Sequence, residues 1–79
     1  MLSRRVLIIE DDADAAGVLE AYLRRENYDV AVTMDGRSGL DMAQRWKPDL
    51  ILLDVMLPGL NGTEVLASLR RKSDVPVIM

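Results

Sequence analysis

Two short apolar runs, each followed at once by acidic residues, constrain the fold of this chain more than any other feature. Residues 6–9 (Val-Leu-Ile-Ile) precede residues 10–12 (Glu-Asp-Asp), and residues 50–53 (Leu-Ile-Leu-Leu) precede Asp54. Runs that are apolar at every position are typical of parallel strands buried on both faces. Ligands of an open α/β sheet bind just past the carboxyl ends of its strands. We therefore expect these acids to converge at one edge of a parallel sheet.

Strand-like and helix-like segments alternate along the whole chain. The predicted strands are residues 5–9, 29–33, 49–53 and 75–79, and the predicted helices are residues 13–26, 37–46 and 63–72. Strands that alternate with helices favour a parallel sheet with right-handed crossovers. The sequence therefore predicts an α/β fold.

Residue types at the ends of the predicted helices support these boundaries. Asp12 is a favourable N-cap for the first helix, and Asn27 is expected to end it. Pro48 closes the second helix, because proline cannot continue a helix and pushes Lys47 out of helical geometry. Helical spacing predicts that the apolar face of the first helix consists of Ala15, Val18, Leu19, Tyr22 and Leu23.

The composition excludes several classes of site. The 79 residues include no cysteine and no histidine, which removes disulfides, thiolate ligands and the commonest general base. The net charge of −3 argues against direct binding to nucleic acid or to an anionic membrane. No apolar run reaches the roughly 18 residues that span a bilayer. We expect one small globular domain in the cytoplasm, with no membrane partner.

The expected convergence of acids indicates a cation site. Carboxylates about 4 Å apart repel each other by roughly 4 kcal/mol at an effective dielectric constant of about 20. Ligand sets made only of oxygen favour a hard cation such as Mg²⁺. Taken singly, the acids at residues 10–14 are more typical of a helix start, and Asp54 alone is equally compatible with a turn cap. Their shared placement after two apolar strands favours the metal site.

The residues around both acidic sites resemble the receiver domain of two-component response regulators. The resemblance rests on residues 6–12 (VLIIEDD), 49–59 (DLILLDVMLPG) and 61–62 (NG), and the spacing of strands and helices extends it over essentially the whole chain. It implies a flavodoxin-like (CheY-like) three-layer fold with strand order 2-1-3-4, followed by a fifth strand in a complete receiver. In that order the first and third strands are neighbours.

The resemblance also implies a role for each acid. Asp54 would be the phosphoacceptor, taking a phosphoryl group from the phosphohistidine of a sensor histidine kinase. Asp11, Asp54 and the backbone carbonyl of Met56 would bind Mg²⁺, and Glu10 would assist. Residues 57–59 (Leu-Pro-Gly) resemble regulators with a winged-helix DNA-binding output domain. The chain would then be a signalling domain rather than an enzyme, reaching DNA only through its output domain and catalysing at most its own phosphorylation and dephosphorylation.

The chain departs from the complete family pattern at its carboxyl end. Receivers carry a Ser or Thr just after the fourth strand and a Lys after the fifth, and this sequence ends at Met79, before both positions. We therefore expect residues 1–79 to be the N-terminal portion of a single receiver, without helix four, strand five, helix five or an output domain. The bared sheet face and edge predict either a homodimer or domain-swapped assembly, or attachment to a longer chain.

Two other functions stay open at this stage. A haloacid-dehalogenase-like hydrolase also forms an aspartyl intermediate, but it carries a second Asp two residues after the nucleophile, where this chain has Met56. A pseudo-receiver that acts only as a protein-interaction module would lose one of the acids, whereas Glu10, Asp11 and Asp54 are all present. The phosphoacceptor receiver is the preferred interpretation.

Overall fold

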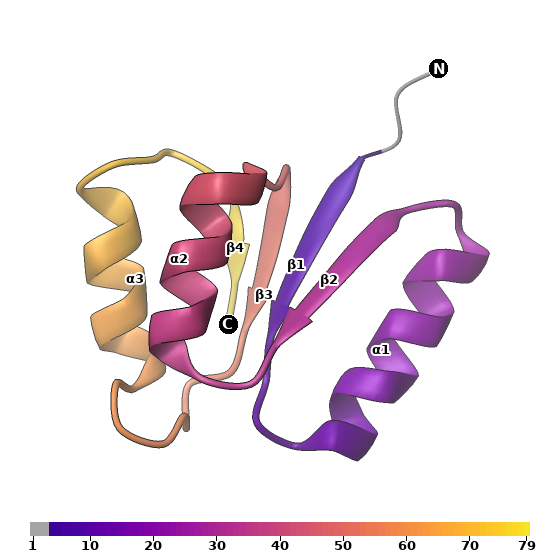
Figure 1. Ribbon diagram of the computed structural model, residues 1–79, viewed down its shortest axis with the longest axis horizontal. Coiled ribbons are helices and arrows are strands. Elements are labelled where there is room, and N and C mark those ends of the chain that lie inside the picture. Colours follow the sequence, from indigo (N-terminus) through magenta and orange to yellow (C-terminus); the bar gives the residue numbers. More distant parts are fainter. Residues whose placement is uncertain (1–3) are drawn as a thin grey trace.

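The computed structural model describes residues 4–79 and has the three-layer α/β architecture that the sequence predicts (Figure 1). The four strands of these residues form one parallel sheet in the order β2-β1-β3-β4. The predicted strand order is therefore confirmed, with β1 and β3 side by side. The elements are β1 (Arg5–Ile9), α1 (Ala13–Arg25), β2 (Asp29–Thr33), α2 (Gly36–Trp46), β3 (Leu50–Leu53), α3 (Gly62–Arg70) and β4 (Val77–Ile78).

The last strand, β4, is shorter than the predicted 75–79: it ends one residue earlier and begins two residues later, because Val75 and Pro76 lack the full backbone pairing of a strand. Pro76 has no backbone N–H to donate to the sheet. The carbonyl of Val75 accepts a hydrogen bond from the guanidinium of Arg70 at 2.7 Å. Pairing with β3 therefore begins at the Pro76 carbonyl, which accepts from the N–H of Ile51 at 3.0 Å.

Side-chain caps begin each of the three helices. Asp12 accepts hydrogen bonds from two backbone N–H groups in the first turn of α1, as predicted. Asp35 caps α2. Asn61 caps α3 and forms a reciprocal capping box with Glu64, a feature that was not predicted from the sequence. With this box in place, α3 begins one residue earlier than predicted.

The helix ends predicted at Asn27 and before Pro48 are confirmed. Asn27 and Lys47 have φ angles of 69° and 53°, in the left-handed region where a right-handed helix stops. The N–H of Lys47 still donates to the carbonyl of Ala43 at 3.2 Å and closes the last turn of α2. Within residues 4–79, none of the helices combines the length and the apolar character needed to cross a membrane.

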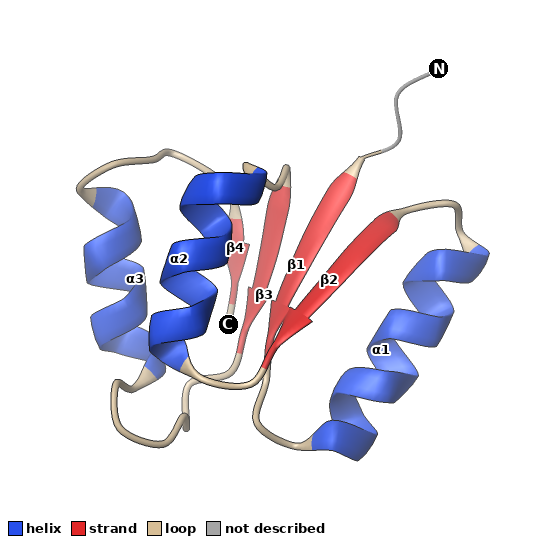
Figure 2. Cartoon of the chain, viewed as in Figure 1, coloured by secondary structure: helices blue, strands red, loops and turns tan. Residues whose placement is uncertain are grey.

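Most of the buried core lies between the sheet and the neighbouring helices α2 and α3, which Figure 2 shows next to each other. On the opposite face of the sheet, α1 packs over β1 and β2. The cluster under α2 and α3 contains Leu7, Ile9, Ile51, Leu53, Leu57, Val65 and Leu69. The cluster under α1 contains Ile8, Ala16 and Val30.

The predicted apolar face of α1 is wrong in part. Val18 and Tyr22 are 71% and 62% exposed, whereas Ala16, outside the predicted face, is buried. Leu19 lines an open groove with Leu52 of β3 and is itself 38% exposed. Because α1 covers only β1 and β2, its apolar stripe is wider than the sheet surface it contacts.

Candidate functional site

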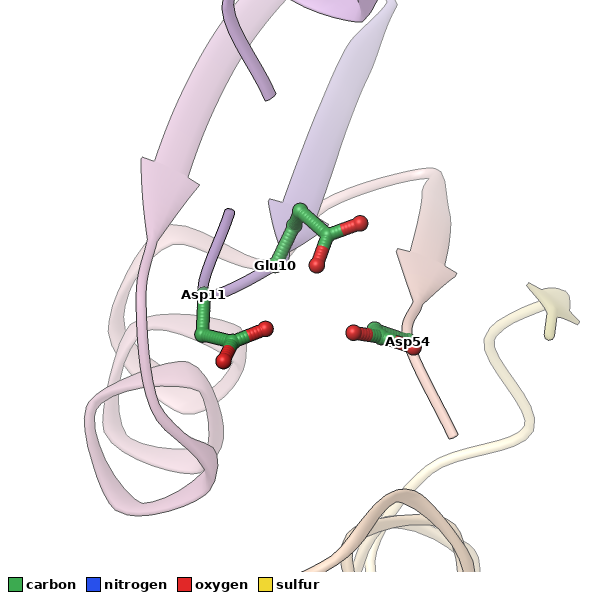
Figure 3. A group of neighbouring side chains, drawn as sticks. All are labelled: Glu10, Asp11 and Asp54. Atoms are coloured by element: carbon green, nitrogen blue, oxygen red, sulfur yellow. The ribbon is translucent and has the colours of Figure 1, made fainter. Parts of the chain in front are cut away.

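Three carboxylates lie together beyond the carboxyl ends of β1 and β3 (Figure 3). Glu10 and Asp11 directly follow β1, and Asp54 directly follows β3. The two strands pair with Ile9 opposite Leu53, and the N–H of Asp54 donates to the carbonyl of Ile9 at 3.0 Å. This register brings the residues after each strand to the same edge, as the sequence predicts.

The carboxylates are close enough to share one cation. One oxygen from each of Glu10, Asp11 and Asp54 lies within 4.8 Å of the others. Glu10 and Asp54 are partly buried and Asp11 is exposed, so the space between them opens to solvent. Figure 3 shows the Asp54 carboxylate facing those of Glu10 and Asp11. Carboxylate oxygens bind hard divalent cations at about 2.0–2.6 Å, which this separation allows.

The pKa shifts of two of the acids show how closely they are placed. The pKa of Glu10 is raised, mainly by its side-chain hydrogen bond with Asp54 and next by burial. The pKa of Asp54 is lowered, mainly by the same contact with Glu10 and next by the N–H of Met56. The two carboxyl groups therefore titrate as a coupled pair, with the pKa of Glu10 shifted upward and that of Asp54 shifted downward.

The loop that follows Asp54 is held close to the strand end. The N–H of Met56 donates to Asp54 Oδ1 at 3.1 Å, and the N–H of Gly62 donates to the carbonyl of Val55 at 2.9 Å. A Cβ at position 62 would lie 2.5 Å from the backbone oxygen of Asp54, so this approach requires glycine. The role of the Met56 carbonyl as a metal ligand stays a prediction.

Asp12 lies next to the cluster in sequence but has a different role. Its carboxylate caps α1, and its N–H donates to Glu10 Oε2 at 3.3 Å. The acidic run thus divides into two residues that face Asp54 and one that starts the helix.

Two residues that position the site were not identified from the sequence. The carbonyl of Thr33, at the end of β2, accepts a hydrogen bond from the N–H of Glu10 at 3.0 Å. Gly62 allows the close approach at the backbone of Asp54. A glycine directly after a helix-capping Asn is a detectable signal, whereas the role of Thr33 depends on the register between β1 and β2.

Comparison with known sequences gives matches to response regulators. Residues 6–79 match the family model of the response regulator receiver domain. The DNA-binding response regulators MtrA of Mycolicibacterium paratuberculosis and Mycobacterium tuberculosis are each 45% identical over 78 residues. These matches cover 99% of this chain and 35% and 34% of the two relatives. The chain thus spans about a third of the length of these curated relatives.

Solved structures also resemble this chain in architecture. The BeF3-activated N-terminal receiver domain of Klebsiella pneumoniae RstA is 35% identical, with a TM-score of 0.90 over 94% of this chain and 63% of that chain. The chemotaxis protein CheY4 of Vibrio cholerae is 28% identical, with a TM-score of 0.91 over 96% of this chain and 66% of that chain. Both likenesses extend over nearly all of the fold described above.

Proposed function

Because this chain belongs to the response regulator receiver family, we propose that it accepts a phosphoryl group on Asp54 from the phosphohistidine of a sensor histidine kinase. The observation that carries the proposal is the convergence of Glu10, Asp11 and Asp54 within 4.8 Å at the ends of neighbouring strands. A carboxylate attacks phosphorus only when ionised, and the lowered pKa of Asp54 favours that form.

The hydrogen bonds of Asp54 support an assignment of its two oxygens. Oδ1 accepts from the N–H of Met56, which holds the carboxylate in one orientation. The other oxygen then attacks the phosphorus atom, and the new P–O bond forms as the P–N bond to the donor imidazole breaks. The donor imidazole leaves with the electron pair of that bond and takes a proton. Positioning of this kind supplies a large part of the rate of phosphoryl transfer.

The donor set fits Mg²⁺, since it consists only of oxygen atoms and carries excess negative charge. We assign Asp11, Asp54 and the backbone carbonyl of Met56 as ligands, with Glu10 assisting. Mg²⁺, when bound, would offset the charge of the carboxylates and of the phosphoryl oxygens. Glu10, Asp11 and Asp54 would act as ligands only when ionised, so Mg²⁺ binding should weaken as the pH falls.

We further propose that the phosphorylated domain controls transcription through a DNA-binding output domain. The MtrA relatives are named DNA-binding response regulators, and this chain matches about a third of their length. The form of residues 57–59 favours the winged-helix class of output. The net charge of −3 disfavours DNA binding by the receiver itself. Such an output would place the protein in the cytoplasm.

Replacement of the phosphoacceptor tests the proposal directly. In the full-length regulator, Asp54→Asn keeps the shape of the side chain but lacks the nucleophilic anion, so incubation with a histidine kinase or acetyl phosphate should leave no acid-labile phosphate on the protein. Asp12→Asn is the matched control, because Asn caps a helix as well as Asp and Asp12 lies outside the cluster. This control should be phosphorylated like the wild type. Phosphate that persists on Asp54→Asn would contradict the assignment, and an unphosphorylated wild type would favour a pseudo-receiver.

Metal binding is tested separately by titration. Asp11→Asn should weaken Mg²⁺ binding at least tenfold, because it removes one charged ligand from a set of three. Isothermal calorimetry on the wild type, Asp11→Asn and Asp12→Asn measures this effect, and only the first variant should differ. Equal affinity in all three proteins would exclude Asp11 as a ligand.

A further inference from the structure

A second concave site lies on the side of the sheet where the strands begin, away from the carboxylates at the strand ends. Both α2 and α3 run upward in Figure 1, so their carboxyl ends lie on the same side of the molecule. Residues at these two ends line a cleft. Its volume is about 360 Å³, within the range of small-molecule sites. Leu40, Leu69 and Val75 are among the apolar side chains that line it, and Ser68 adds a hydroxyl group.

Both lysines of the chain line this one cleft. Lys47 and Lys72 are the only lysines among the 79 residues, and they come from segments far apart in sequence. Within residues 4–79, the ion pairs are Arg24–Glu20 and Arg45–Asp41, so neither lysine has a carboxylate partner there. Both lysines of a protein with a net charge of −3 thus lie at one partly apolar cleft.

The backbone at Lys47 does not by itself favour a lysine. Its φ of 53° lies in the left-handed region, where glycine or asparagine fits a helix end with less conformational cost. Lys47 lines the cleft and carries a positive charge that glycine would not supply. The ordinary role of such a lysine is to offset the partial negative charge at the end of a helix, which requires no cleft beside it.

We propose that the cleft between α2 and α3 binds a small amphipathic carboxylate. Its apolar body would contact Leu40, Leu69 and Val75, and its carboxylate would pair with Lys47 and Lys72. Burial of the body supplies the driving force, and the two cations set the orientation and the preference for an anion. This site is independent of Asp54, and its test does not depend on phosphorylation.

Octanoate is the probe, and octanamide is its uncharged match. Titration into the complete protein, followed by amide chemical shifts, should give saturable changes confined to residues 40–48 and 68–75. Octanamide should bind at least tenfold more weakly, because it lacks the charge that the lysines recognise. Absence of saturable shifts at up to about 10 mM octanoate would overturn the proposal and leave the lysines as helix-end charges.

Two paired variants separate recognition by the lysines from a general effect of charge. Lys47→Gln with Lys72→Gln should weaken octanoate binding at least tenfold and leave octanamide binding unchanged. Arg25→Gln with Arg37→Gln removes the same charge from exposed positions outside the cleft and should leave both affinities unchanged. Equal loss in the two double variants would overturn the specific role of the lysines.

A third variant tests the cleft itself. Ser68→Leu places a larger side chain in the cleft and should abolish the binding of both octanoate and octanamide. The amide spectrum of each free variant reports whether the fold is retained. Octanoate that binds Ser68→Leu with unchanged affinity would locate its site elsewhere.

Discussion

The two faces of the sheet differ in how completely helices cover them. Under α2 and α3 seven buried side chains form one cluster, whereas under α1 the cluster has three, and Ile78 is 58% exposed on that side. Adjacent residues of β3 show the contrast, because Ile51 is fully buried and Leu52 only partly. The carboxylates therefore follow strands whose buried packing lies chiefly on the α2 and α3 side of the sheet.

The exposed face gives the largest expected effect. Copies of the isolated 79-residue polypeptide should associate with one another through Leu19 and Ile78. Each Å² of apolar surface that association removes from water favours the complex by about 25 cal/mol. Sedimentation should give a mass above 8.8 kDa at micromolar concentration. Leu19→Lys with Ile78→Lys should restore the monomer, whereas Ala67→Lys, at an exposed position of α3, should not. A wild-type polypeptide that sediments as a monomer, with amides protected from exchange, would contradict this prediction. It would show that α1 alone is enough to keep this face of the sheet from associating.

Ile51 and Leu52 are neighbours in β3 and face opposite sides of the sheet, so truncating each side chain compares how much the two faces contribute to the free energy of unfolding. Ile51→Ala should lower the free energy of unfolding by about 3–5 kcal/mol, because it leaves a cavity in a fully buried site. Leu52→Ala should lower it by about 1–2 kcal/mol, since less of that side chain is buried. Urea denaturation of both variants gives the difference. Equal losses would mean that the two faces contribute alike.

The sequence predicts which residues share a face of the sheet but not how far each face is covered. Alternation along residues 6–9 and 50–53 follows from strand geometry alone. The extent of coverage depends on where each helix lies over the sheet, and a helical stripe does not contain that information. Val18 and Tyr22 show this limit, because helical spacing places them on the apolar face of the first helix, whereas both are exposed in the structure.

The candidate site was predictable to a greater extent, because strand ends fix its main residues. Glu10, Asp11 and Asp54 converge as expected once β1 and β3 are neighbours. The role of Thr33 was missed because a backbone carbonyl gives no chemical signal in the sequence, whereas the role of Gly62 was missed although a glycine after a helix-capping Asn is detectable. Their roles depend on register and on close approach, which only the folded chain defines.

The helices on the two faces also differ in how closely their glycines approach neighbouring atoms. A Cβ at Gly39 of α2 would lie 2.5 Å from Ile9, whereas a Cβ at Gly17 of α1 meets nothing within 4 Å. Gly39→Ala should therefore destabilise the protein by about 1–3 kcal/mol through overpacking. Gly17→Ala should stabilise it by up to about 1 kcal/mol, because alanine favours the helix. Thermal denaturation gives both signs, and matching signs would contradict the difference in packing.

The smallest expected effect concerns the start of α2 and its dependence on pH. Asp35 accepts hydrogen bonds from the backbone N–H and the hydroxyl of Ser38 at 2.8 and 3.0 Å. The Ser38 N–H, and next its hydroxyl, hold the pKa of Asp35 below its ordinary value. A carboxyl group with a lower pKa in the folded state contributes stability that is complete above the unfolded pKa. That contribution is lost as the pH falls through the folded pKa, so α2 should weaken below about pH 4.

Asp35→Asn isolates this contribution, because Asn keeps the cap but does not titrate. Urea unfolding of wild type and variant between about pH 5 and pH 2.5 should give a smaller loss of stability in the variant. The carboxylates elsewhere titrate in both proteins, so the difference between the two curves reports Asp35. Amide exchange should place the change in α2 rather than in α1, since the hydrogen bonds to Asp35 come from Ser38 of α2. Parallel curves would show that the Ser38 hydrogen bonds stabilise neutral and ionised Asp35 equally.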